Sequence, residues 1–200
     1  MKKLLLTSFE PFGGESVNAS SMVAETLPDR IGEWEIYKAV IPVVFGRGAV
    51  TAAEYADKYN ADAILCLGQA AGRRSVTPEM VAINLMHARI PDNDGNCPHD
   101  EPIEEGAPAA YFSTLSARLM ADAITAGGIS GDVSYSAGTY VCNDVLYRLL
   151  HRYSGCNGGS VRVGFIHVPV TPKQAGGKDL PSMDTETAAR AVACSIAAIS

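Results

Sequence analysis

Short apolar runs alternate along this chain with segments whose apolar residues recur at the spacing of a helix. These runs predict strands, and Trp34–Phe45 among them is rich in β-branched and aromatic residues. They cover Lys3–Ser8, Trp34–Phe45 (interrupted by Pro42), Ala61–Leu67, Asp132–Ser136 and Val161–Val168. The helical segments cover residues 18–27, 48–59, 109–126, 142–152 and 183–199. This alternation predicts an α/β fold, with a mostly parallel sheet that carries helices on both of its faces.

Two segments of the chain are less regular. Thr77-Pro78-Glu79 resembles a helix start, but Val81 and Ile83 alternate with smaller or polar residues, so we predict an extended segment over 77–90. The acidic stretch 91–108 is rich in proline and glycine and predicts a long loop, of a length that is usually functional or interfacial. No change in composition marks a linker, so residues 1–200 are predicted to form a single domain.

Charge and cysteine content exclude several classes of protein. The formal net charge of −6 disfavours nucleic acid and anionic membranes as partners. The apolar run Leu4–Leu6 is too short for a signal peptide, and no stretch approaches the ~20 apolar residues of a membrane span. The five cysteines form an odd count without a CxxC pair, so we expect no disulfide framework. We therefore expect a cytoplasmic protein that binds neither nucleic acid nor membrane.

One cysteine stands out by its position. Cys142 lies in the stretch Ser136–Asn143, between a predicted strand and a predicted helix, and falls where the helix begins. Unpaired backbone N–H groups and the positive end of the helix dipole favour a thiolate there. Cys66 and Cys194 lie instead in apolar segments, as small buried hydrophobic residues do. Cys142 is therefore the candidate nucleophile.

A nucleophilic thiol needs a base, and the base needs an orienting group. Of the four histidines, His167 lies at the end of a predicted strand, as Cys142 lies just beyond another. Because the carboxyl ends of parallel strands meet at one edge of a sheet, these two residues are expected to converge. The orienting carboxylate is either Glu79 or Asp92, and spacing in the sequence does not choose between them.

The sequence predicts no metal and no cofactor. Residues 92–96 resemble a calcium loop, but the glycine comes too early and the final glutamate is missing. Cys97 and His99 lack a second pair of zinc ligands. The loop Gly68–Arg74 follows a strand, as anion-binding loops do, but it has neither of the usual phosphate-binding patterns.

Several motifs resemble those of one family of cysteine peptidases, the pyroglutamyl peptidase I (pyrrolidone-carboxylate peptidase) family. They occur in the family's order over nearly the whole chain. The matching stretches are FEPFGG at 9–14, GQA at 68–70, VAIN at 81–84, ARIPDN at 88–93, PAAYFSTL at 108–115, AGT at 137–139, VCN at 141–143, FIHVP at 165–169 and PSM at 181–183.

The resemblance implies a Glu79/Cys142/His167 triad, and it selects Glu79 over Asp92. It implies a phosphorylase/hydrolase-like, three-layer α/β/α sandwich without a cofactor, which acts on N-terminal pyroglutamyl peptides. It further implies a homo-oligomer, a tetramer or a dimer. The residues that it implies for substrate binding are Phe9, Phe12, Gln69, Arg89, Tyr140 and Val141.

The chain departs from the family pattern near the nucleophile, where Tyr140 replaces a residue that is more often phenylalanine. Other departures are Ala19, Ala71, Met80 and Met86-His87. Two alternative functions stay open. A nucleoside phosphorylase or hydrolase would need phosphate-binding groups in the loop Gly68–Arg74, and a silent lactam-binding protein would keep the pocket without activity. Pairing of Cys97 or Cys156 between subunits also stays open.

Overall fold

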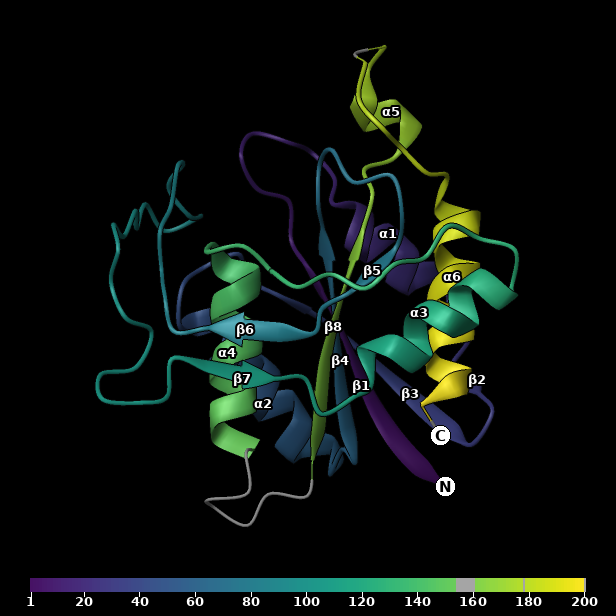
Figure 1. Ribbon diagram of the computed structural model, residues 1–200, viewed down its shortest axis with the longest axis horizontal. Coiled ribbons are helices and arrows are strands. Elements are labelled where there is room, and N and C mark those ends of the chain that lie inside the picture. The colour runs from purple at the N-terminus through teal and green to yellow at the C-terminus, as the bar shows by residue number, and fades with distance from the viewer. Residues whose placement is uncertain (154–160, 178, 200) are drawn as a thin grey trace.

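The computed structural model describes residues 1–153, 161–177 and 179–199 (Figure 1). Strands and helices alternate along most of this length, as predicted. The strands are β1 Lys2–Phe9, β2 Arg30–Ile31, β3 Trp34–Ile41, β4 Ala63–Gln69, β5 Thr77–Pro78, β6 Val81–Ile83, β7 Ala110–Phe112 and β8 Arg162–Val168. The helices are α1 Ala19–Thr26, α2 Arg47–Tyr59, α3 Ala117–Ala126, α4 Val141–Tyr153, α5 Pro172–Ala175 and α6 Thr185–Ala198.

The central sheet has the strand order β2-β3-β1-β4-β8-β5. The four long strands β3, β1, β4 and β8 are parallel, as predicted. The short edge strands β2 and β5 are antiparallel to their neighbours, so the sheet is mixed. A separate antiparallel ribbon, β6 with β7, lies beside α4. The parallel strands bring the carboxyl ends of β1, β4 and β8 to one edge of the sheet (Figure 1).

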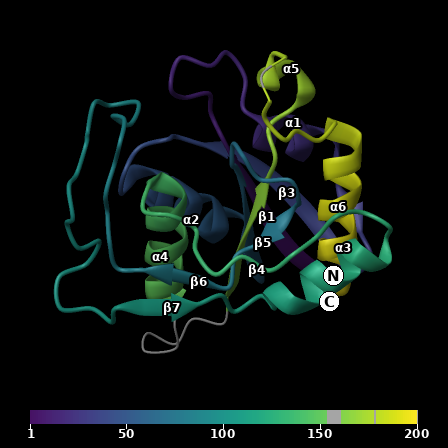
Figure 2. The same ribbon diagram turned by 45° about the horizontal axis from the view of Figure 1, so that its top comes forward.

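Helices cover both faces of this sheet (Figure 2). Side chains of successive strand residues point to opposite faces, and β1 supplies both cores in this way. Leu4 and Leu6 pack with buried residues of α1, α3 and α6, such as Val192. Leu5 packs on the other face with buried residues of α2 and α4, such as Val145. The predicted arrangement of helices on both faces is confirmed.

Two predictions of local structure were wrong, and one short helix was not predicted. Residues 109–126 do not form one helix, because α3 begins only after Ser116, whose side chain accepts a hydrogen bond from the Leu119 N–H at 3.3 Å. Residues 110–112 pair with β6 instead. Residues 132–136 form only an isolated bridge, between Ser134 and Glu79. The helix α5 was missed, although Thr171 and Gln174 form a capping box at its start.

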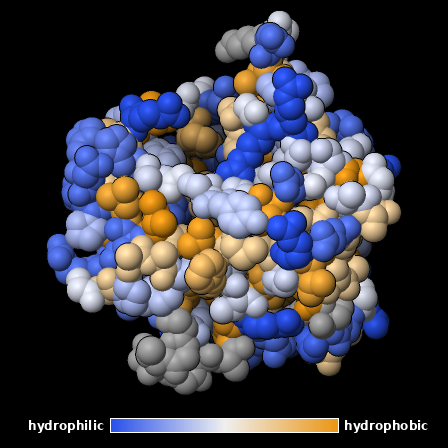
Figure 3. All heavy atoms as spheres, in the orientation of Figure 1, coloured by the Kyte–Doolittle hydropathy of each residue, from blue (hydrophilic) through white to orange (hydrophobic). Residues whose placement is uncertain are grey.

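Apolar residues on the face drawn in Figure 3 lie in small groups among polar ones. The most exposed of the large apolar side chains in the described part of the chain is Phe112 of β7, which is 72% exposed. No helix in the described part of the chain is long and apolar enough to cross a membrane.

Candidate active site

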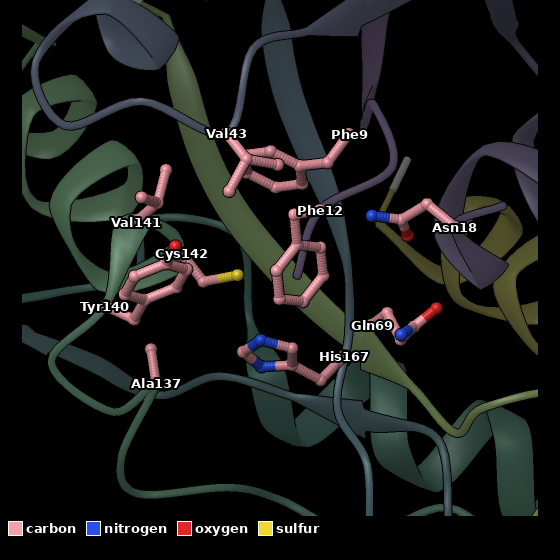
Figure 4. Close-up of a pocket in the computed structure, with 10 residues that line it drawn as sticks. All are labelled: Phe9, Phe12, Asn18, Val43, Gln69, Ala137, Tyr140, Val141, Cys142 and His167. Atoms are coloured by element: carbon pink, nitrogen blue, oxygen red, sulfur yellow. The ribbon is translucent and has the colours of Figure 1, made fainter. Parts of the chain in front are cut away.

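A cavity of about 140 Å³ opens at the sheet edge where β1, β4 and β8 end. Its walls come from these strand ends, from the loops that follow β1 and β3, and from the start of α4 (Figure 4). The lining residues are Phe9, Phe12, Asn18, Val43, Gln69, Ala137, Tyr140, Val141, Cys142 and His167. Residues from distant parts of the sequence therefore converge at the edge where the strand pattern predicted a site.

Cys142 is the second residue of α4, and its sulfur points into the cavity (Figure 4). Gly68 of β4 lies against it, since a Cβ atom at Gly68 would stand 3.0 Å from Cys142 Sγ and 2.7 Å from the Phe165 ring. The absence of a side chain at Gly68 thus lets the strand approach the sulfur closely. A side chain at residue 68 would limit where Sγ can lie.

The expected thiolate at Cys142 is not what the surroundings favour. Burial raises the pKa of the Cys142 thiol to about 12, and the nearby Glu79 carboxylate acts in the same direction. The Arg73 guanidinium lowers this pKa, but by less. Burial therefore acts against the effect of the helix N-terminus, on which the sequence prediction was based. The resting thiol is protonated and needs a base to become a nucleophile.

His167, on β8, is held by Glu79. Its Nδ1 lies 2.7 Å from Glu79 Oε1, and the Glu79 side chain is completely buried. The backbone N–H of Glu79 donates to the carbonyl oxygen of Phe165 at 2.8 Å, which fixes the carboxylate beside β8. Burial lowers the pKa of His167, and Glu79 opposes this effect. A neutral imidazole that donates from Nδ1 to Glu79 leaves Nε2 as a proton acceptor.

Asp92, the other candidate carboxylate, holds a loop instead. Its carboxylate accepts hydrogen bonds from the backbone N–H groups of Phe45, Asp94 and Asn96, at 2.8–3.0 Å. These bonds lower the pKa of Asp92 although burial raises it. Of the two carboxylates that the spacing left open, only Glu79 contacts His167.

Aromatic side chains form the walls of the cavity. The rings of Phe12 and Tyr140 lie 6.1 Å apart, and the Phe45 ring meets Tyr140 edge-on at 5.4 Å. The Tyr140 hydroxyl donates to the carbonyl oxygen of Pro91 at 3.0 Å, which anchors the ring to the long loop. Phe9 is buried at the end of β1. Such walls suit a flat and mostly apolar ring.

Gln69 supplies a polar group of fixed orientation. Its Oε1 accepts hydrogen bonds from the Ala19 N–H at 2.7 Å and from Gln174 Nε2 at 2.8 Å. The carboxamide nitrogen consequently points toward the cavity (Figure 4). Because both bonds to Oε1 come from donors, the orientation of the amide is determined by its partners.

Three lining residues were not among the predicted site residues. Asn18 was predicted only as the start of a helix, and it caps α1 with its Oδ1, which accepts a hydrogen bond from the Ser20 N–H at 3.0 Å. Val43 and Ala137 lie in loops. A helix cap that follows the loop after β1 was the one signal that could have found Asn18, because such a cap lies at the functional edge of the sheet.

Arg89 does not line this cavity. Its side chain is exposed and lines a neighbouring hollow of about 370 Å³, which shares only Phe12 and Tyr140 with the first. Cys97 is a free thiol whose sulfur lies 3.5 Å from the carbonyl oxygen of Ala88. Cys156 lies outside the described residues. Within the described ranges, no cluster of three or more His, Cys, Asp or Glu side chains is arranged to hold a metal ion.

The residue after Cys142 connects α4 to the β6–β7 ribbon. Asn143 is completely buried, and its side chain accepts from the Ile83 N–H at 3.0 Å and donates to the carbonyl oxygens of Ile83 and Leu85 at 2.9 and 3.1 Å. The start of α4, and Cys142 with it, is thereby fixed against β6.

Comparisons with known proteins agree on one family. The family model described as pyroglutamyl peptidase matches residues 2–200. A pyrrolidone-carboxylate peptidase of Bacillus cereus (strain Q1) is 44% identical, over 94% of this chain and 87% of its own length. Another, of Thermosipho africanus, is 44% identical over 98% of this chain and 96% of its own.

Solved structures that match this chain belong to the same family. A crystal structure of Bacillus amyloliquefaciens pyroglutamyl peptidase I matches with a TM-score of 0.94 and 41% identity, covering 100% of this chain and 97% of that chain. The pyrrolidone carboxyl peptidase from Thermococcus litoralis matches with a TM-score of 0.92 and 39% identity, over 100% of this chain and 93% of its own.

Proposed function

This chain belongs to the pyroglutamyl peptidase family, and on that premise we propose that Cys142, His167 and Glu79 are its nucleophile, general base and orienting carboxylate. The protein is a cysteine-type peptidase that removes N-terminal pyroglutamyl residues from peptides. The observation that carries the assignment is the 2.7 Å contact between His167 Nδ1 and Glu79 Oε1, at the side of a cavity that also holds the Cys142 sulfur.

The cavity suits the pyroglutamyl ring in size and polarity. Its volume of about 140 Å³ is that of a single small ring; apolar cavities of about 150 Å³ take up benzene. Phe9, Phe12 and Tyr140 would enclose the uncharged lactam, with Val141 beside them. The Gln69 amide nitrogen would donate to the lactam carbonyl, which fixes the orientation of the ring in the cavity.

The chemistry follows from the protonation states. His167 Nε2 takes the proton from the Cys142 thiol as Sγ attacks the carbonyl that joins pyroglutamate to the next residue. Backbone N–H groups at the start of α4 stabilise the oxyanion, at about 3 kcal/mol for each donor. His167 then protonates the leaving amine, which releases the shortened peptide and leaves a thioacyl enzyme. In the second half-reaction His167 activates water, which hydrolyses the thioester.

Arg89 is assigned a role at the rim rather than in the ring pocket, since it lines the adjacent hollow. For the architecture we adopt the three-layer α/β/α sandwich, supported by the two groups of helices that pack on opposite faces of the sheet. We also propose a cytoplasmic homo-oligomer, a tetramer or a dimer. The free thiols of Cys66, Cys97 and Cys194 suit a reducing compartment.

Hydrolysis of a pyroglutamyl arylamide tests the triad directly. The wild-type protein should release the arylamine, and Cys142→Ser should lose this activity, because a serine hydroxyl is a far weaker nucleophile than a thiolate. Cys97→Ser is the matched control and should keep wild-type activity, because Cys97 lies outside the cavity. Full activity in Cys142→Ser would refute the assignment of the nucleophile, and an inert wild-type protein would refute the function.

A further inference from the structure

Arg73, in the loop between β4 and β5, makes a set of contacts that the mechanism above does not use. Its Nη1 lies 2.7 Å from Glu79 Oε1, the same oxygen that His167 Nδ1 contacts. Nη1 also donates to the Thr77 hydroxyl, and Nη2 donates to the carbonyl oxygen of Ser136 at 3.1 Å. The guanidinium therefore bridges the carboxylate that orients His167 and the beginning of the loop that leads to Cys142.

We propose that Arg73 is a positioning residue of this peptidase, which holds the Glu79 carboxylate in line with His167 and ties it to the nucleophile loop at Ser136. The proposal rests on the function proposed above. It also gives a role to part of the loop Gly68–Arg74, which on sequence grounds was a weak candidate for binding phosphate. The guanidinium is occupied by groups of this chain instead.

The burial of Glu79 explains why such a partner is needed. An ionised carboxylate with no exposed surface is costly unless it is paired and hydrogen-bonded. The Arg73 side chain is 25% exposed, so its charge stays partly solvated while its guanidinium contacts the buried Glu79 carboxylate. Arg73 is not among the residues that line the cavity, so it acts on the reaction through Glu79 and not by touching the substrate.

The charge of Arg73 also acts on both partners of the proton transfer. The charged groups that act on His167 are Glu79 and Arg73, and Cys142 lines the same cavity. The guanidinium lowers the pKa of His167, and it lowers the pKa of Cys142. Loss of the positive charge would therefore raise both values. A higher pKa of His167 means that the free base forms at a higher pH, which moves the acidic limb of kcat/KM upward.

The test compares Arg73→Gln, Arg73→Lys and the matched control Arg74→Gln, whose side chain is exposed. We expect kcat on a pyroglutamyl arylamide to fall about 10- to 100-fold in Arg73→Gln, in the range that a misplaced catalytic group costs. KM should change by less than about twofold, since Arg73 does not line the ring pocket. The acidic limb should move to higher pH. Lysine keeps the positive charge but cannot contact Glu79 and the Ser136 carbonyl oxygen at the same time. The kcat of Arg73→Lys should therefore lie between those of Arg73→Gln and the wild-type protein.

Thermal unfolding of each variant shows that the protein compared is folded. A wild-type protein without activity would refute the function on which the proposal rests. An active wild-type protein with an Arg73→Gln variant of unchanged kcat and pH profile would refute the positioning role alone. A folded Arg73→Gln variant that loses affinity while its kcat is kept would also overturn the proposal, because Arg73 would then contact the substrate.

Discussion

Replacing Gly68 by alanine tests whether the close approach of β4 to Cys142, the proposed nucleophile, affects catalysis. The new Cβ would lie 2.7 Å from the Phe165 ring and 3.0 Å from Cys142 Sγ. Carbon atoms in contact prefer about 3.5–4.0 Å, so the ring would have to retreat by roughly 1 Å. Phe165 is completely buried, and its ring packs against His167 at 4.7 Å and Phe9 at 6.2 Å. The ring cannot move without disturbing both sides of the cavity.

Two magnitudes follow from this crowding. Overpacking of a rigid core costs about 1–3 kcal/mol. A loss of about 2 kcal/mol in the free energy of unfolding lowers Tm by about 4–8 °C for a chain of this length. The sulfur would also be pushed aside by roughly half an ångström, and a misplacement of about 1 Å at a reacting atom can cost 10²-fold in rate. We expect kcat/KM of Gly68→Ala to fall about 10-fold or more.

The matched control is Gly164→Ala on β8. A Cβ at Gly164 would lie 2.9 Å from Leu115 Cβ, which is a similar clash, but Leu115 belongs to the core on the opposite face from Cys142. Both variants should lose similar stability in urea unfolding, and Gly164→Ala should keep kcat/KM within about twofold of wild type. Equal activity of the two variants would refute the argument that residue 68 limits the position of the sulfur.

Two further predictions concern the thiol and the ring wall. Burial raises the pKa of Cys142 to about 12, so the rate of its alkylation by iodoacetamide in substrate-free protein should rise about tenfold per pH unit up to pH 10. The Cys142→Ser variant gives the background labelling of the other cysteines. A rate that is already constant near neutral pH would contradict a protonated resting thiol. Tyr140→Phe removes only the hydroxyl that is hydrogen-bonded to Pro91, so the free energy of unfolding should fall by about 0.5–1.5 kcal/mol while KM stays unchanged. A raised KM would mean that the hydroxyl binds substrate.

Sequence periodicity predicted the elements whose buried residues repeat with a single strand or helix period. β1, β4 and α4 were found because apolar residues repeat with the period of a strand or a helix. Ala110–Phe112 was predicted as helix and forms β7, because pairing with β6, far away in the chain, outweighs local propensity.

Some features of the candidate site could likewise be predicted from the sequence, and others could not. The positions of Cys142 and His167 at helix start and strand end were visible in the sequence, since strand order places such residues at one edge. Glu79 could not be chosen over Asp92 by spacing, because the choice depends on a backbone hydrogen bond between Glu79 and Phe165. Burial raises the pKa of Cys142, against the direction that its place at a helix start favours, and this burial has no local signal in the sequence.

The place of β8 in the sheet has a consequence for how the protein acquires its activity. This strand comes late in the chain, yet it lies in the interior of the sheet, between β4 and β5. During synthesis β4 has no partner on one side until residues 162–168, which form β8, leave the ribosome. Pairing of strands that lie far apart in the sequence is slow. The same pairing delivers His167 to the cavity. On the proposed assignment, a nascent chain without residues 162–168 would hold the Cys142 thiol without its base, and proteolytic activity would start only after β8 has paired with β4.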